Sequence, residues 1–126
     1  MKYLKTLFLS IILLLIAFMQ TKAQQVITLS KGIDHVKECS SAVKDAIAAG
    51  DGATAQNKAK DLLVALNEVP VKYMTPAQAS HWTKYANQLQ SERKHISEVS
   101  DVADQKQHFT TFAANLQAAV DGLRMK

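Results

Sequence analysis

The sequence predicts an all-α protein, an antiparallel up-down-up-down four-helix bundle that follows an N-terminal signal peptide. Three observations carry this prediction. Apolar residues recur at three- and four-residue steps over four separate stretches after position 30, which is the pattern of amphipathic helices. The stretches are separated by glycine, by proline or by a Ser-Asp pair, and the connectors are short, as antiparallel neighbours require. No alternation of apolar and polar residues typical of a β-strand occurs in this region.

The first 23 residues have the layout of a secretory signal. Two lysines precede an apolar run of 13 residues, Leu7 to Met19, and Thr21-Lys22-Ala23 then offers small residues at a cleavage site. The apolar run is shorter than the about 20 residues that a membrane span needs. We therefore expect export to the periplasm, cleavage before Gln24 and no stable membrane insertion afterwards. An uncleaved anchor is the alternative.

The charge of the chain depends strongly on this signal. The 126 residues include 15 basic and 11 acidic side chains, a net charge of +4. Three of the lysines lie in the signal, so 12 basic residues remain against 11 acidic ones and the net charge falls to +1. Because no basic block remains, the sequence does not predict a nucleic-acid partner. We divide the rest into a disordered leader, residues 24–29, and one bundle domain, residues 30–126.

The first and second helices are expected over residues 30–49 and 53–68. Ser30 is a suitable N-cap for the first helix, and Gly50-Asp51-Gly52 ends it, because glycine adopts the left-handed cap conformation at little cost. Pro70 ends the second helix, since proline disfavours helical geometry in the preceding residue. The predicted apolar faces are Ile33, Val36, Cys39, Val43, Ala46 and Ile47 on the first helix and Ala55, Ala59, Leu62, Leu66 and Val69 on the second.

The third and fourth helices, expected over residues 75–99 and 102–123, form a hairpin. Thr75-Pro76 starts the third helix with an N-cap followed by proline at the first helical position, and Ser100-Asp101 separates the two helices. Trp82, the only tryptophan, is the predicted centre of the core. The predicted stripes are Ala79, Trp82, Ala86, Leu89, Ile96 and Val99 on the third helix and Phe109, Phe112, Leu116, Ala119 and Leu123 on the fourth.

Catalytic motifs are missing from the sequence. It contains no Gly-rich phosphate loop, no nucleophile elbow, no His-Glu-x-x-His motif and no Cys-x-x-Cys-His haem attachment motif. The serines and carboxylates fall on the polar faces of the expected helices, where a solvated surface accounts for them. We therefore expect a protein that is not an enzyme.

Five side chains are candidate metal ligands. His35 and Cys39 are four residues apart and share one helical face, and imidazole with thiolate suits copper or zinc. Cys39 also lies on the apolar stripe, where an inert buried cysteine is the alternative. His81, His95 and His108 each directly precede a predicted core residue. His95 and His108 are at mirror positions about the break between the last two helices, so either they approach each other across the hairpin or their rings pack beside the core.

Three stretches carry a family resemblance: VKDAIAAGD at residues 43–51, the alanine-rich residues 55–66 with AKDLL, and SHW at 80–82 followed by residues 100–109, which begin with SD and end with QKQHF. They resemble exported bacterial helical-bundle domains of unknown function that occur alone or attached to CusB-type adaptor subunits of heavy-metal efflux systems. The resemblance implies a periplasmic, non-enzymatic bundle connected with copper or other metal handling, whose partners are envelope proteins of a metal efflux system. Many members continue into a Cys-Pro-Met segment that looks metal-binding, and this sequence stops at Lys126 without it.

Two functions follow as hypotheses. The first is an accessory or binding module for copper or other heavy metals, with copper or zinc as the ion. The alternative is a structural protein–protein interaction domain of the cell envelope that binds no small ligand. Its expected anchors are Tyr73, Met74 and Tyr85, which would then form an exposed apolar patch of a few hundred Å². An enzyme would instead need two buried carboxylates or an inward His-Asp pair in a closed pocket.

Overall fold

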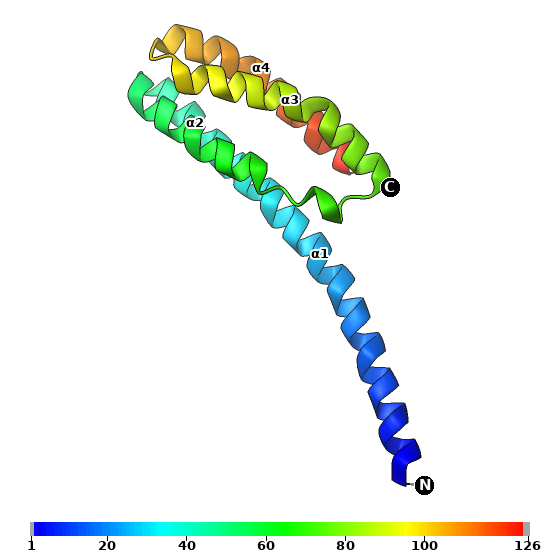
Figure 1. Cartoon of the computed structure of the whole chain (residues 1–126). Coiled ribbons are helices and arrows are strands. Elements are labelled where there is room, and N and C mark those ends of the chain that lie inside the picture. The colour runs from blue at the N-terminus through cyan, green and yellow to red at the C-terminus, as the bar shows by residue number, and fades with distance from the viewer. Residues whose placement is uncertain (1, 125–126) are drawn as a thin grey trace.

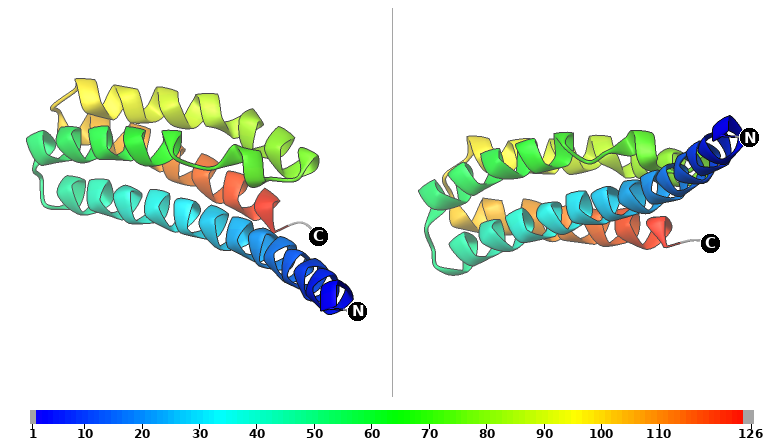
Figure 2. Two further views of the ribbon diagram at one scale, coloured as in Figure 1. Left: turned by 60° about the horizontal axis from the view of Figure 1, so that its bottom comes forward. Right: turned by 90° about the horizontal axis from the view of Figure 1, so that it is seen from below.

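The structure, a computed structural model, describes the backbone of residues 2–124 and the side chains of residues 22–124. In this part the chain forms helices α1 (Lys2–Ala48), α2 (Gly52–Asn67), α3 (Pro76–Glu98) and α4 (Val102–Leu123), and no strand. A short 3-10 helix, η1 (Val71–Tyr73), connects α2 to α3. The α1–α2 and α3–α4 connectors lie at the same end of the molecule (Figures 1 and 2). The predicted all-α bundle of four antiparallel helices is confirmed.

Helix α1 is much longer than expected. It is continuous from Lys2 to Ala48, so residues 24–29 are helical rather than a disordered leader, and Ser30 lies inside the helix rather than at its N-cap. The physical reason is that no proline or glycine lies between the apolar N-terminal run and Gly32, and serine in a helix interior is only mildly unfavourable. The N-terminal part of α1 projects away from the other helices (Figure 1).

The predicted signal peptide, residues 1–23, lies largely outside what the structure describes. Met1 and the side chains of residues 2–21 are not described, so cleavage before Gln24 stays a prediction. Among the described residues, none of the helices combines the length and the apolar character that crossing a membrane requires.

The turn between α1 and α2 has the predicted chemistry. Gly50 has φ of +73°, the left-handed conformation that ends a helix. Its N–H donates to the carbonyl of Ile47, and the N–H of Asp51 donates to the carbonyl of Ala46, both over 3.0 Å. Asp51 is also the N-cap of α2, because its carboxylate accepts from the N–H of Thr54 over 3.0 Å. The helix boundary predicted from this glycine is therefore confirmed.

The α2–α3 and α3–α4 boundaries also follow the predicted caps. Thr75 and Gln78 form a reciprocal capping box at the start of α3, with Pro76 at the first helical position. The carboxylate of Asp101 accepts from the N–H of Ala103 at the start of α4. The connector between α2 and α3 contains the 3-10 helix η1. The N-terminus of each helix in the α3–α4 hairpin is thus capped by side-chain hydrogen bonds.

One hydrophobic core lies between the helices. Trp82 is 3% exposed, as predicted. Cys39 is only half-buried, at the edge of the core. Helix α3 packs closely on α4 and α1 on α2, whereas α1 and α4 touch little. The fully buried large apolar side chains are Val36, Val43, Leu62, Leu89, Ile96 and Phe112.

Three polar side chains, Ser40, Arg93 and Gln105, are buried although the apolar stripes do not predict them. Gln105 is fully buried. Its Nε2 donates to the carbonyls of Gly52 at 3.0 Å and Val99 at 2.7 Å, which connects the start of α4 to the start of α2 and the end of α3. Its Oε1 accepts no hydrogen bond from the described residues. Arg93 donates through Nε to Gln90 at 3.0 Å, and burial lowers the pKa of its guanidinium. Gln105 therefore links three helices, whereas the Arg93 hydrogen bond lies within α3.

Candidate metal site

Two histidines meet across the α3–α4 hairpin. His95 lies in the last turn of α3 and His108 near the start of α4, and their ring centroids are 3.6 Å apart with planes inclined by 32°. Asp104, one turn before His108, faces both rings. Its Oδ2 lies 3.4 Å from Nε2 of His95, and its Oδ1 lies 3.4 Å from Nε2 of His108. The approach of the two histidines follows from the antiparallel hairpin, which brings mirror positions together.

These three residues are the strongest metal-type cluster in the described part of the chain. One ligand atom from each of His95, Asp104 and His108 lies within 4.8 Å of the others, and no other group of three or more His, Cys, Asp or Glu side chains described here is this close. The side chains are 43%, 38% and 28% exposed, respectively. The cluster is therefore open to ions from solvent on one side while the hairpin fixes it on the other.

Glu92 holds the ring of His108 from the opposite side. Its Oε2 lies 2.6 Å from Nδ1 of His108, and its side chain is only 12% exposed. Its other oxygen accepts from Nε2 of Gln88 at 2.8 Å. Because an ionised carboxylate only accepts hydrogen bonds, Nδ1 of His108 is the donor, and in the neutral ring Nε2 then carries the lone pair that faces Asp104. This is the arrangement by which a carboxylate orients a ligating imidazole in metal sites.

The spacing of the three ligand atoms suits a small transition-metal ion. Nε2 of neutral His108 and the Asp104 carboxylate are both acceptors, so a cation between them, a proton or a metal ion, makes the contact favourable. With metal–ligand bonds of about 2.0–2.2 Å, two ligands of a tetrahedral ion lie roughly 3.3–3.6 Å apart. Each imidazole lies 3.4 Å from the Asp104 carboxylate, His95 from Oδ2 and His108 from Oδ1. Three protein ligands with a fourth position left to water is the pattern of an open site.

His81 is not part of this cluster. Its Nε2 lies 2.8 Å from the carbonyl oxygen of Ala118, to which it donates, and its ring stands 5.2 Å from that of Tyr85. A Cβ at Gly122 would lie 1.8 Å from the His81 ring, so only glycine lets α4 approach this closely. The structure thus places His81 as a link between α3 and α4, away from the other histidines.

His35 and Cys39 lie together on α1, as their spacing predicts, with Nε2 of His35 3.9 Å from Sγ of Cys39. Glu38 and Asp61 line the small pocket beside them, about 160 Å³ in volume. Burial, followed by the charges of Asp61 and Glu38, raises the pKa of the Cys39 thiol. The thiol is therefore kept protonated, and this pair is a weaker metal site than the α3–α4 cluster.

The residues expected to anchor a partner protein are half-buried. Met74 and Tyr85 pack against the core, and Tyr73 is partly covered. Among the described side chains, the large hydrophobic residues that are exposed are Val26, Ile27, Val64 and Val71.

Sequence reasoning located part of the cluster. The mirror positions of His95 and His108 left their approach across the hairpin as one of two alternatives, and nothing in the sequence indicated Asp104 or Glu92, whose carboxylates looked like ordinary surface charges. The i, i+4 spacing of Asp104 and His108 on one face of α4 is a signal that could have found the third ligand.

The family comparison covers most of the chain. A family model described as "Protein of unknown function (DUF3347)" matches residues 41–126, from the end of α1 through α4. This segment contains the α3–α4 cluster but not His35 or Cys39. Comparisons with curated proteins and with solved structures find no match. The description states no activity, so the association with CusB-type adaptors stays a prediction. The chain belongs to the DUF3347 family of proteins of unknown function.

Proposed function

We propose that this protein is a non-enzymatic, periplasmic module that binds a divalent transition-metal ion, copper or zinc, between α3 and α4. In this proposal His95, Asp104 and His108 are the ligands, and Glu92 orients His108. The observation that carries it is the convergence of three ligand atoms within 4.8 Å of one another across the hairpin. Two imidazoles and one carboxylate form a donor set of borderline softness, which suits Cu(II) and Zn(II) better than Ca²⁺ or Mg²⁺.

The openness of the site favours binding and transfer over permanent storage. A closed structural zinc site has four protein ligands, and this cluster offers three on a partly exposed surface. An ion held this way keeps a coordination position for water or for a ligand from another protein. Such a site supports an accessory role in copper or heavy-metal handling, in which the module exchanges an ion with envelope proteins of an efflux system.

Titration of the purified metal-free protein tests this proposal. We expect one Cu(II) or Zn(II) ion per chain by isothermal titration calorimetry, and substitution of His95→Ala or His108→Ala to weaken binding at least about tenfold. Cu(I) serves as a comparison, because a site without thiolate or thioether ligands disfavours the softer ion.

His35→Ala is the matched control, because His35 is an exposed histidine on α1 outside the cluster. It should bind the ion as the unmodified protein does. If His35→Ala loses as much affinity as His95→Ala, or if the protein takes up no ion at all, the proposed site is wrong.

A further inference from the structure

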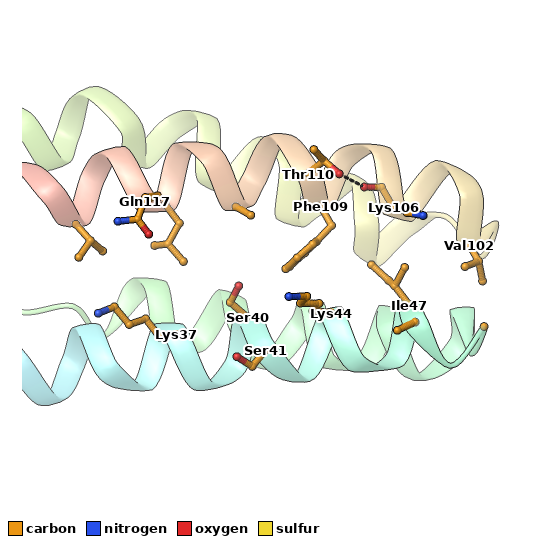
Figure 3. Close-up of a pocket in the computed structure, with 15 residues that line it drawn as sticks. Lys37, Ser40, Ser41, Lys44, Ile47, Val102, Lys106, Phe109, Thr110 and Gln117 are labelled. Atoms are coloured by element: carbon orange, nitrogen blue, oxygen red, sulfur yellow. Dashed lines mark hydrogen bonds between the residues drawn. The ribbon is translucent and has the colours of Figure 1, made fainter.

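A groove runs between α1 and α4, which pack less closely than the other neighbouring helices of the bundle do (Figure 3). It has a volume of about 870 Å³, within the roughly 300–1,000 Å³ typical of small-molecule sites. Its apolar lining comes from Ile47, Phe109, Ala113, Leu116 and Val120. The groove lies on a different face of α4 from the metal cluster and shares no residue with it.

The charged residues that line the groove are all positive. Lys37 and Lys44 come from α1 and Lys106 from α4, and no acidic residue is among the lining residues. None of the three forms an ion pair with the described residues, whereas Lys58 and Lys94 elsewhere on the molecule do. Because like charges gathered beside an apolar surface repel one another, an anion bound there is favourable.

Ser40 adds one uncharged polar group to the lining of the groove. Its side chain is 7% exposed and points into the gap between α1 and α4 (Figure 3). Helical hydroxyls often donate to the carbonyl one turn back, as Thr28 does to Gln24 and Thr110 to Lys106. The hydroxyl of Ser40 makes no hydrogen bond with any described residue. Because this hydroxyl is unpaired within the described residues, it can donate to a polar head group bound in the groove.

We propose that the α1–α4 groove binds an anionic amphiphile with one acyl chain, of the fatty-acid type. The acyl chain lies over the apolar lining, and the acidic head group lies within reach of Lys37, Ser40 and Lys44. An apolar lining with only basic charged residues beside it is complementary to an apolar chain that ends in an acidic group.

Binding of 12-carbon probes tests the proposal. Dodecanoate, dodecanol and dodecyltrimethylammonium share one chain and differ in head-group charge, and calorimetry below their micelle concentrations measures each. We expect one dodecanoate per chain, bound at least about tenfold more tightly than the other two probes. The double variant Lys37→Glu/Lys44→Glu should bind dodecanoate about tenfold more weakly. Its charge-matched control, Lys60→Glu/Lys94→Glu on other faces of the molecule, should keep the full affinity for dodecanoate. Equal binding of dodecanoate and dodecanol would overturn the proposal.

A second pair of variants tests the location. Ala113 lines the groove, whereas its neighbour Ala114 is exposed outside it. Ala113→Phe should fill the groove and abolish dodecanoate binding, and Ala114→Phe should leave it unchanged. If Ala113→Phe does not fold, Ser40→Ala serves instead, with an expected loss of about threefold and no decrease in thermal stability. If Ala113→Phe and Ala114→Phe change dodecanoate binding equally, the groove is not the binding site. If sedimentation shows a dimer that only Ala113→Phe dissociates, the groove binds a second copy of the chain rather than a lipid.

Discussion

The role proposed for Glu92 can be tested sharply, because Glu92 is not one of the proposed metal ligands. Removing the carboxylate by Glu92→Ala leaves all three proposed ligands in place but frees Nδ1 of His108. The ring can then rotate or protonate at the wrong nitrogen, so its lone pair no longer points at the ion. Metal affinity should fall even though no ligand has been lost.

The structure sets the magnitude. The 2.6 Å contact is a short, charge-assisted hydrogen bond, and Glu92 is 12% exposed, so water replaces it poorly. Loss of such an outer partner typically costs 10- to 100-fold in metal affinity. We expect about 30-fold, or about 2 kcal/mol. Glu98 on the same helix is the matched control: it is 60% exposed and 4.0 Å from Lys94, so Glu98→Ala should cost less than about 0.5 kcal/mol.

Calorimetry with Zn(II) against a competing chelator at neutral pH measures both variants. Thermal unfolding of the metal-free proteins checks that they fold, and we expect Glu92→Ala to cost about 1 kcal/mol there from the lost hydrogen bond. At equal free Zn(II), the stabilisation by metal should shrink by the same about 2 kcal/mol that calorimetry finds. Unchanged affinity in Glu92→Ala, or the same loss in Glu98→Ala, would refute the reasoning and remove His108 from the ligand set.

Three further predictions concern the fold. Gln105→Ala leaves two carbonyls without their donor and opens a cavity, so we expect the free energy of unfolding measured in urea to fall by about 2–4 kcal/mol. The exposed control Gln107→Ala should lower it by less than about 0.5 kcal/mol. Similar losses in the two variants would contradict the role of Gln105 in linking the helices. Trp82→Ala should cost about 3–5 kcal/mol, and an unchanged thermal midpoint would show that Trp82 is not in the core. Hydrogen bonds from the hydroxyl and N–H of Thr54 lower the pKa of the Asp51 carboxyl. Its contribution to stability is therefore complete above the ordinary carboxyl pKa of about 4 and is lost as the pH falls through the lower folded-state value. Asp51→Asn should flatten the acid limb of the stability curve, and an unaltered limb would argue against this cap.

The helices were predictable wherever a local signal marks their ends. Gly50, Thr75-Pro76 and Asp101 act through their own backbone conformation and nearby hydrogen bonds, so three boundaries agree with the expectation to within a residue or two. The start of α1 was not predictable in this way, because Ser30 is only a weak N-cap signal within an uninterrupted helical stretch. Gln105 was missed because its burial depends on carbonyls from α2 and α3, which no local pattern reveals.

By itself, the sequence determined the four amphipathic helices and their connectors, and it offered the approach of His95 to His108 as one alternative, since periodicity and hairpin symmetry are properties of one or two adjacent segments. Only the tertiary structure decided that Asp104 and Glu92 complete that pair, that His81 instead binds a carbonyl against Gly122, and that α1 and α4 leave a lysine-lined groove. Each of these depends on distances between helices. Those distances are set by how the side chains of all four helices fill one core.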